Sequence, residues 1–191
     1  GPSVRDPFLL GRRGAGDVLQ AFTLAFAAAT EAGGYGLRVQ PNVAFSPSAP
    51  LGGDGMALNV ADPDCVDLRD PALVPVGGSS GDYWLFFTCM RASEVGEIRA
   101  ARFNSAFELQ GSPSGRIVIS PASVGSLADQ GVFAAEPIVR SSDAGLTLLV
   151  WAVARDVAGT YSLVLMTGQV PAAEVPDGGV SEAPTLDTLP T

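Results

Sequence analysis

Histidine and lysine are absent from this sequence, and all eleven basic residues are arginines. Without histidine the chain cannot form a Ser-His-Asp or Cys-His catalytic group, a histidine general base, or the histidine-containing sites that bind most catalytic zinc. No serine or cysteine has a neighbouring base that would activate it as a nucleophile. The acid–base candidates that remain are carboxyl groups.

Charged residues are scarce, at 16%, and they leave a formal net charge of −9. An acidic chain is a poor partner for nucleic acid or an anionic membrane surface, because both attract basic patches. Apolar runs are short, about ten residues at most, against the roughly 20 that a transmembrane helix needs. The composition therefore indicates a globular protein with no nucleic-acid partner and no membrane span.

Cysteine occurs only twice, at Cys65 and Cys89. A disulfide between them would stabilise the fold by about 3 kcal/mol and would imply an oxidising compartment. The alternative is two buried thiols that pack as small apolar side chains. The opening Gly1-Pro2 resembles a protease-cleavage scar, so a leader could have been removed. We expect a secreted, periplasmic or cell-surface protein from a bacterium with a GC-rich genome, which the arginine-only, alanine-rich usage suggests.

An acidic residue followed by proline recurs three times, with spacings of 64 and 66 residues. The acids are Asp6, Asp70 and Glu136. Each pair is followed by an apolar run, a glycine turn, a second apolar run, another glycine turn and a third run. Such regularity is the signature of a repeat architecture.

The second runs of the repeats begin at residues 18, 83 and 146 and are rich in aromatic and β-branched residues. Short runs of this kind between glycine turns predict antiparallel strands. Runs 83–90 and 146–154 are apolar nearly throughout, so both faces of their sheets should be covered, as when blades stack around an axis. We expect an all-β protein of β-propeller-like repeats, with three four-stranded antiparallel blades that form a partial propeller or one completed by oligomerisation.

The first repeat has a helical alternative. Residues 17–34 combine Asp17 as an N-cap, an alanine-rich interior and Gly33 as a stop. Register with the other repeats favours a strand, and Phe22, Leu24 and Phe26 alternate with smaller residues. A strand is the prediction.

The repeats divide the chain into a propeller-like domain, residues 1–170, and a proline-rich acidic tail or linker, residues 171–191, which should be poorly ordered. The repeat boundaries are expected at about 5–66, 67–133 and 134–170. Connections rich in proline, glycine and serine join them, and the stretch "RIVIS" at 116–120 could supply an outer, fourth strand.

The pattern "RDPALV…GDYWLFFT…GEIRAARF", within residues 69–103, resembles the blades of five-bladed propellers of glycoside hydrolase families 43 and 32, the arabinanase-like and levansucrase-like enzymes. The resemblance covers residues 5–168, although the family has five repeats and this chain has three. It implies that Asp6 would act as general base, Asp70 would tune pKa and orient substrate, and Glu136 would act as general acid. Inverting hydrolysis of this kind needs two carboxyl groups roughly 6.5–9.5 Å apart and no metal.

An acid in every repeat also fits a structural role. A carboxylate at the start of a strand can accept backbone N–H bonds, while proline fixes the entry of the chain. The large aromatic residues could stack on sugar rings but are expected in the core. They are Tyr83, Trp84, Trp151 and Tyr161.

One acidic stretch offers oxygen ligands of the type that suits calcium. Its candidates are Asp54, Asn59, Asp62 and Asp64, with Asp67 beside them. Their spacing matches no EF-hand loop, and the alternative is a solvated acidic loop. No cofactor other than calcium is expected.

The function expected from these features is a non-catalytic extracellular or cell-surface propeller module that presents loops to a protein partner or assembles as a homo-oligomer. The alternative is a carbohydrate-binding or glycoside-hydrolase-like propeller that uses its carboxylates at the propeller mouth.

Overall fold

The computed structural model describes residues 3–13, 19–43, 55–76, 81–142, 145–171 and 187–188. Within these residues the chain forms three antiparallel sheets with only short helical turns, which confirms the all-β prediction. Among the described residues, none of the helices has the length and apolar character needed to cross a membrane.

The first sheet has the strand order β1 (Val4–Arg13), β2 (Leu19–Ala29), β3 (Tyr35–Val43) and β4 (Met56–Ala57). The alanine-rich segment is therefore a strand, as predicted. Its alternate side chains face two different environments, which explains why the segment resembles an amphipathic helix in composition without forming one.

The second sheet contains β5 (Asp67–Pro75), β6 (Tyr83–Met90), β7 (Gly96–Phe103) and β8 (Leu109–Gln110) in that order, with β9 (Arg116–Ile119) also paired to β7. The stretch "RIVIS" does supply an outer strand. The predicted count of four strands is wrong for this sheet, because β8 and β9 both pair with β7.

The third sheet follows the short helix α1 (Pro121–Val124) and a single 3-10 turn. Its order is β10 (Val132–Ser142), β11 (Gly145–Arg155), β12 (Tyr161–Pro171) and β13 (Asp187–Thr188). The predicted tail thus contains a two-residue strand, which pairs with β12 through Met166 and Thr167. The rest of the tail lies outside the described residues.

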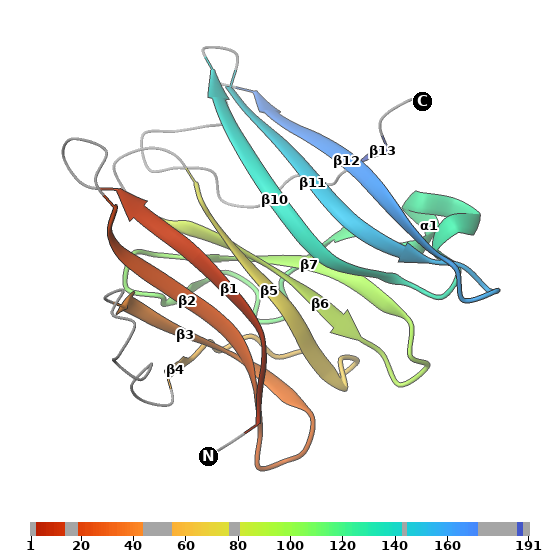
Figure 1. Cartoon of the computed structure of the whole chain (residues 1–191), viewed down its shortest axis with the longest axis horizontal. Helices are drawn as coiled ribbons and strands as arrows, with labels where there is room; N and C mark the ends of the chain where they lie inside the picture. Colours follow the sequence, from red (N-terminus) through yellow and green to blue (C-terminus); the bar gives the residue numbers. More distant parts are fainter. Residues whose placement is uncertain are drawn as a thin grey trace.

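The three sheets stack with the second in the middle (Figure 1). The first strand of each, namely β1, β5 and β10, lies on the inner side of the stack, and β5 contacts both of the others. This arrangement of sheets around an inner column of strands is that of propeller blades.

The middle sheet is buried on both faces, as predicted for an apolar run that does not alternate. On β6, Trp84 and Phe86 pack into a core shared with the third sheet. Leu85 and Phe87, on the opposite face, pack into a core shared with the first sheet. Successive residues from Trp84 to Phe87 therefore face apolar neighbours on alternate sides of the sheet.

Among the described residues, the third sheet is covered on one face only, so the prediction of two covered faces is wrong for residues 146–154. The even-numbered residues of β11 are buried against the second sheet. On the other face, Trp151 is 39% exposed and Tyr161 is 65% exposed. The expected core position is therefore wrong for both aromatics, although it is confirmed for Trp84.

A disulfide joins Cys65 to Cys89. Cys65 lies in the segment just before β5, and Cys89 lies in β6, so the disulfide ties this segment to the second sheet. Of the two alternatives that the sequence left open, a disulfide or two buried thiols, the structure has the disulfide. Cys89 is fully buried in the core between the first and second sheets.

Candidate functional site

Each inner strand carries a β-bulge at the same place. The register of pairing shifts between Arg5 and Phe8 in the first sheet and between Arg69 and Ala72 in the second. In the third sheet it shifts between Phe133 and Glu136. An extra residue inserted in this way bends the strand and redirects its side chains.

One residue in each bulge has a positive φ: 52° at Asp6, 48° at Asp70 and 51° at Ala134. These three positions are therefore structurally equivalent, and they are spaced evenly along the chain, 64 residues apart. The alignment that placed Glu136 in register with Asp6 and Asp70 is wrong by two residues. Glu136 is instead the equivalent of Phe8 and Ala72, the residues that resume pairing after the bulge.

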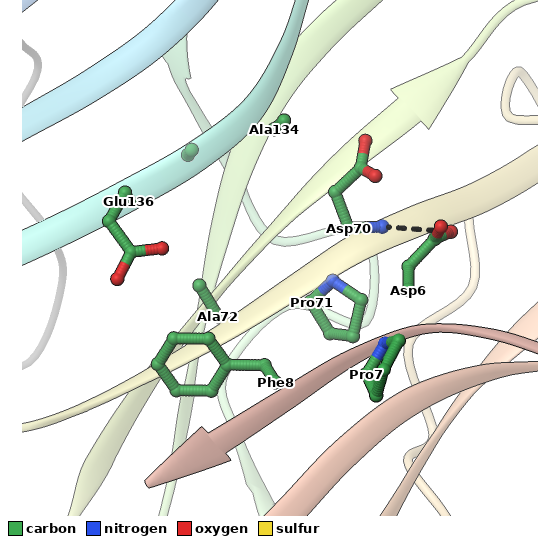
Figure 2. Close-up of a pocket in the computed structure, with 9 residues that line it drawn as sticks. Asp6, Pro7, Phe8, Asp70, Pro71, Ala72, Ala134 and Glu136 are labelled. Carbon is green, nitrogen blue, oxygen red and sulfur yellow. Dashed lines mark hydrogen bonds between the residues drawn. The ribbon is translucent and has the colours of Figure 1, made fainter.

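The three bulges enclose a pocket with a volume of about 190 Å³. Its lining consists of three consecutive residues from each inner strand: Asp6, Pro7 and Phe8; Asp70, Pro71 and Ala72; Ala134, Ala135 and Glu136. Figure 2 shows Asp6 and Asp70 together on one side and Glu136 reaching in from β10 on the other. The structure thus brings all three predicted acids to one pocket.

The two aspartates also connect neighbouring sheets. The backbone N–H of Asp70 donates to Oδ2 of Asp6 over 3.5 Å. Oδ2 of Asp70 accepts from the Thr88 hydroxyl at 2.8 Å, and Thr88 Oγ1 in turn accepts from the backbone N–H of Ala134 at 3.1 Å. This chain of hydrogen bonds runs from the first inner strand to the third.

Asp70 is the carboxyl group with the most constrained environment in the pocket. Burial raises its pKa above the usual value, and the nearby charge of Asp6 acts in the same direction. The hydrogen bond from Thr88 acts in the opposite direction without cancelling the effect. Such a raised pKa is typical of functional carboxyl groups, but burial at a structural position produces it equally.

A wider hollow, which we call the mouth, lies next to the pocket and shares Asp6, Asp70 and Ala134 with it. Its volume is about 490 Å³. The remaining lining residues are Arg5, Arg69, Met90, Glu94, Phe133, Val153, Arg155 and Tyr161. The mouth lies within the size range of small-molecule sites, roughly 300–1,000 Å³, whereas the pocket is below it.

The three arginines of the mouth differ in their partners. Arg5 and Arg69 both pair with Oδ2 of Asp67, at 2.6 and 2.7 Å, and Arg5 also stacks over the ring of Tyr35. Arg155 has no ion pair with any described residue, and its closest aromatic neighbour is Tyr161, whose ring centre lies 5.9 Å from the guanidinium carbon.

The predicted calcium ligands do not form a cluster within the described part of the chain, where no group of three or more acids is placed to hold a metal. Asp62 pairs with the buried Arg99 at 2.6 Å and accepts the backbone N–H of Asp64. Asp67 is used by Arg5 and Arg69. Asp54 lies outside the described residues, so a calcium site that includes Asp54 and Asn59 stays a prediction.

Sequence reasoning missed three residues of this region: Thr88, Ala134 and Arg155. Thr88 could have been found, because it is the one aliphatic hydroxyl residue in the otherwise apolar and aromatic run 83–90. Ala134 carries no signal of its own, since only its backbone conformation marks it as equivalent to the aspartates. Arg155 ends a strand whose orientation depends on the stacking of whole sheets.

Neither a known protein family nor a curated protein matches this sequence. Among solved structures, the chain is similar in fold to a thermostable family-43 glycoside hydrolase, with a TM-score of 0.50 and 12% sequence identity. The match covers 95% of this chain and 55% of the enzyme, so the chain spans little more than half of its length. At this identity the likeness establishes a shared fold.

Proposed function

We propose that this chain is a propeller module that binds carbohydrate at its mouth and does not hydrolyse it. The observation that carries the proposal is the convergence of three successive inner strands on one acid-lined pocket that opens into a larger hollow. Sugars are bound by hydrogen bonds from their hydroxyls and by contact with aromatic faces. The mouth offers both, through Asp6 and Asp70 and through Phe133 and Tyr161.

The likeness to a glycoside hydrolase supports a carbohydrate ligand as an analogy of fold. Binding is favoured over hydrolysis because of how the acids are used. Asp6 accepts a hydrogen bond from the second sheet, and Asp70 accepts one from Thr88, which in turn accepts the backbone N–H of Ala134 in the third sheet. The third equivalent position is Ala134, which has no carboxyl group, and Glu136 lines the pocket but not the mouth.

Binding can be tested on a glycan array followed by calorimetry, with Tyr161→Ala and the control Val157→Ala. Both side chains are highly exposed, but only Tyr161 lines the mouth. Loss of an aromatic face should weaken binding about three- to tenfold in Tyr161→Ala and leave the control unchanged. Absence of glycan binding by the unmodified protein would overturn the proposal.

Hydrolysis is tested separately with arabinan and fructan as substrates. We expect no release of reducing sugar by the unmodified protein or by Glu136→Gln. Activity that is present in the former and lost in the latter would show that the module is an enzyme and that the motif-based role of Glu136 is correct.

The disulfide supports a location outside the reducing cytoplasm, because thiols are kept reduced there in most organisms. We therefore propose that the protein is exported, as its cysteines suggested. This places the mouth where it would meet extracellular glycans.

A second candidate function, assembly, is favoured by the side of the third sheet that no other described element covers, which we call the third-sheet face. Away from the end that lines the mouth, it consists of Glu136, Ile138, Arg140, Thr147, Leu149, Trp151, Leu163, Leu165, Thr167 and Gln169. Half of these side chains are apolar, and Leu163 is 67% exposed. An exposed apolar patch of this kind is typical of a protein interface.

We propose that a second copy of this chain covers the third-sheet face. The face contains one acid and one arginine, whereas the whole chain has a net charge of −9. Two copies therefore meet there without the repulsion that acts between their other surfaces. The same face on both copies gives an isologous, two-fold interface.

A further inference from the structure

We propose that the mouth binds a hexuronate unit, a sugar that carries a carboxylate, and that Arg155 binds this carboxylate. The inference rests on the proposed carbohydrate binding and specifies the class of sugar. It follows from the one guanidinium of the mouth that has no anionic partner among the described residues.

Arg155 is the last residue of β11 and lines the mouth together with Tyr161, its partner across the strand pair. Its Nε is buried and has no hydrogen-bond partner among the described residues. A buried donor without an acceptor destabilises the protein, more so when the group is charged. A ligand carboxylate beside Arg155 would accept that hydrogen bond and neutralise the charge.

The other arginines of the mouth cannot serve this purpose equally well. Arg5 and Arg69 already share the carboxylate of Asp67, which lies in a strand of the second sheet. Arg5 also pairs with Oδ2 of Asp6 at 3.3 Å, so two carboxylates compensate the charges of these two arginines. Arg155 remains as the cation that can discriminate an acidic ligand from a neutral one.

The remaining charges of the mouth favour a sugar acid over a simple anion. Asp6, Asp70 and Glu94 line the same hollow, and ionised carboxylates only accept hydrogen bonds. A phosphate or sulfate would be repelled by them. A hexuronate instead presents hydroxyl donors to these acids and a single carboxylate to the arginine.

The shape of the mouth agrees with such a ligand. Its volume of about 490 Å³ is within the range of small-molecule sites. Tyr161 is 65% exposed, so its ring is available for contact with a sugar face, and Phe133 contributes to the same lining. The guanidinium of Arg155 lies near the Tyr161 ring, so a sugar stacked on the ring places its carboxylate close to the cation.

The test measures calorimetric binding of galacturonate and glucuronate oligosaccharides and of their methyl esters, which keep the sugar and remove the charge. The unmodified protein should bind at least one acid about tenfold or more tightly than its ester. Arg155→Gln should reduce this preference by about tenfold to a hundredfold while leaving binding of the ester in place. The control is Arg140→Gln, which makes the same change of charge on the same sheet outside the mouth and should leave the preference intact.

Equal binding of acid and ester by the unmodified protein would overturn the inference, as would a preference that survives in Arg155→Gln. Binding of neutral glycans without any binding of hexuronates would overturn the inference and leave the proposed function standing. Absence of binding to every glycan would overturn both. Cooperative thermal melting of both variants, at or above the temperature of the unmodified protein for Arg155→Gln, confirms that the comparison is made between folded proteins.

Discussion

At the scale of the residue, the two aspartates of the pocket join the inner strands while they line the hollow. Asp70 is the clearer case, because its carboxylate receives the Thr88 hydroxyl and its backbone N–H donates to Asp6. A buried carboxylate that takes part in such a chain affects the stability of the fold as well as the chemistry of the pocket. Its ionisation therefore couples folding to pH.

Because the pKa of Asp70 is raised in the folded protein, the folded state holds a proton that the unfolded state has released. Stability contributed by this group is therefore fully present below the ordinary aspartate pKa and is lost as pH rises through the raised one. As pH rises from the ordinary aspartate pKa to the raised pKa of Asp70, the free energy of unfolding of the wild type should fall relative to that of Asp70→Asn. Urea unfolding at a series of pH values measures the difference.

The control for this measurement is Asp129→Asn, an exposed carboxylate outside both hollows. It makes the same change in net charge and should show no such fall. A flat difference between wild type and Asp70→Asn across the acidic range would contradict the assignment of the raised pKa.

The residues of the pocket could be predicted from the sequence only in part. Asp6 and Asp70 are predictable as pocket residues because each belongs to an Asp-Pro pair that recurs in the sequence. Glu136-Pro137 imitates the same pair, but the bulge of the third sheet falls on Ala134 and Ala135 instead. Position within a bulge depends on backbone conformation and on hydrogen bonds from a neighbouring sheet, neither of which a dipeptide specifies.

At the scale of the element, two glycines allow the backbones of the second and third sheets to come into close contact. Gly96, the first residue of β7, and Gly131, just before β10, form an isolated parallel bridge. A Cβ on Gly131 would lie 2.4 Å from the backbone nitrogen of Gly96, and the φ of Gly131 is +120°. Both the contact and the backbone conformation therefore require glycine here.

Gly131→Ala should destabilise the protein by more than the roughly 1–3 kcal/mol that the backbone conformation alone costs, because the two sheets must also separate. Gly111→Ala is the matched control, since Gly111 has a φ of +103° and nothing within 4 Å of its Cβ position. Chemical unfolding of both variants measures the two costs. Equal losses would show that the contact between the sheets contributes nothing.

The elements themselves were largely predictable. The alternation of Phe22, Leu24 and Phe26 identified a strand in a segment with the composition of a helix, because both faces of that strand meet apolar groups. The apolar run at 146–154 led to a wrong prediction of two covered faces. Its pattern specifies what each face can pack against, but a local pattern does not show whether a partner is present.

At the scale of the whole molecule, the third-sheet face is the surface that a partner would cover. If a second copy covers it, self-association should appear in sedimentation over a concentration series. Leu163→Glu should weaken it at least about tenfold, because a carboxylate would be buried in the interface.

Val157→Glu is the control for the association experiment. Val157 is 73% exposed but lies in the turn between β11 and β12, outside the third-sheet face. It should associate as the unmodified protein does. A chain that remains monomeric at every concentration would exclude the second copy as the partner.

The opposite end of the stack is closed differently. The outer side of the first sheet carries Phe26, which is only 4% exposed and has Gly55 against its ring, while Arg38 donates to the carbonyl of Gly55. Stacking of the third-sheet face of one copy onto the first sheet of the next would have to displace this segment. If a second copy covers the third-sheet face, this difference between the two ends of the stack favours a closed two-fold pair over head-to-tail stacking into fibres.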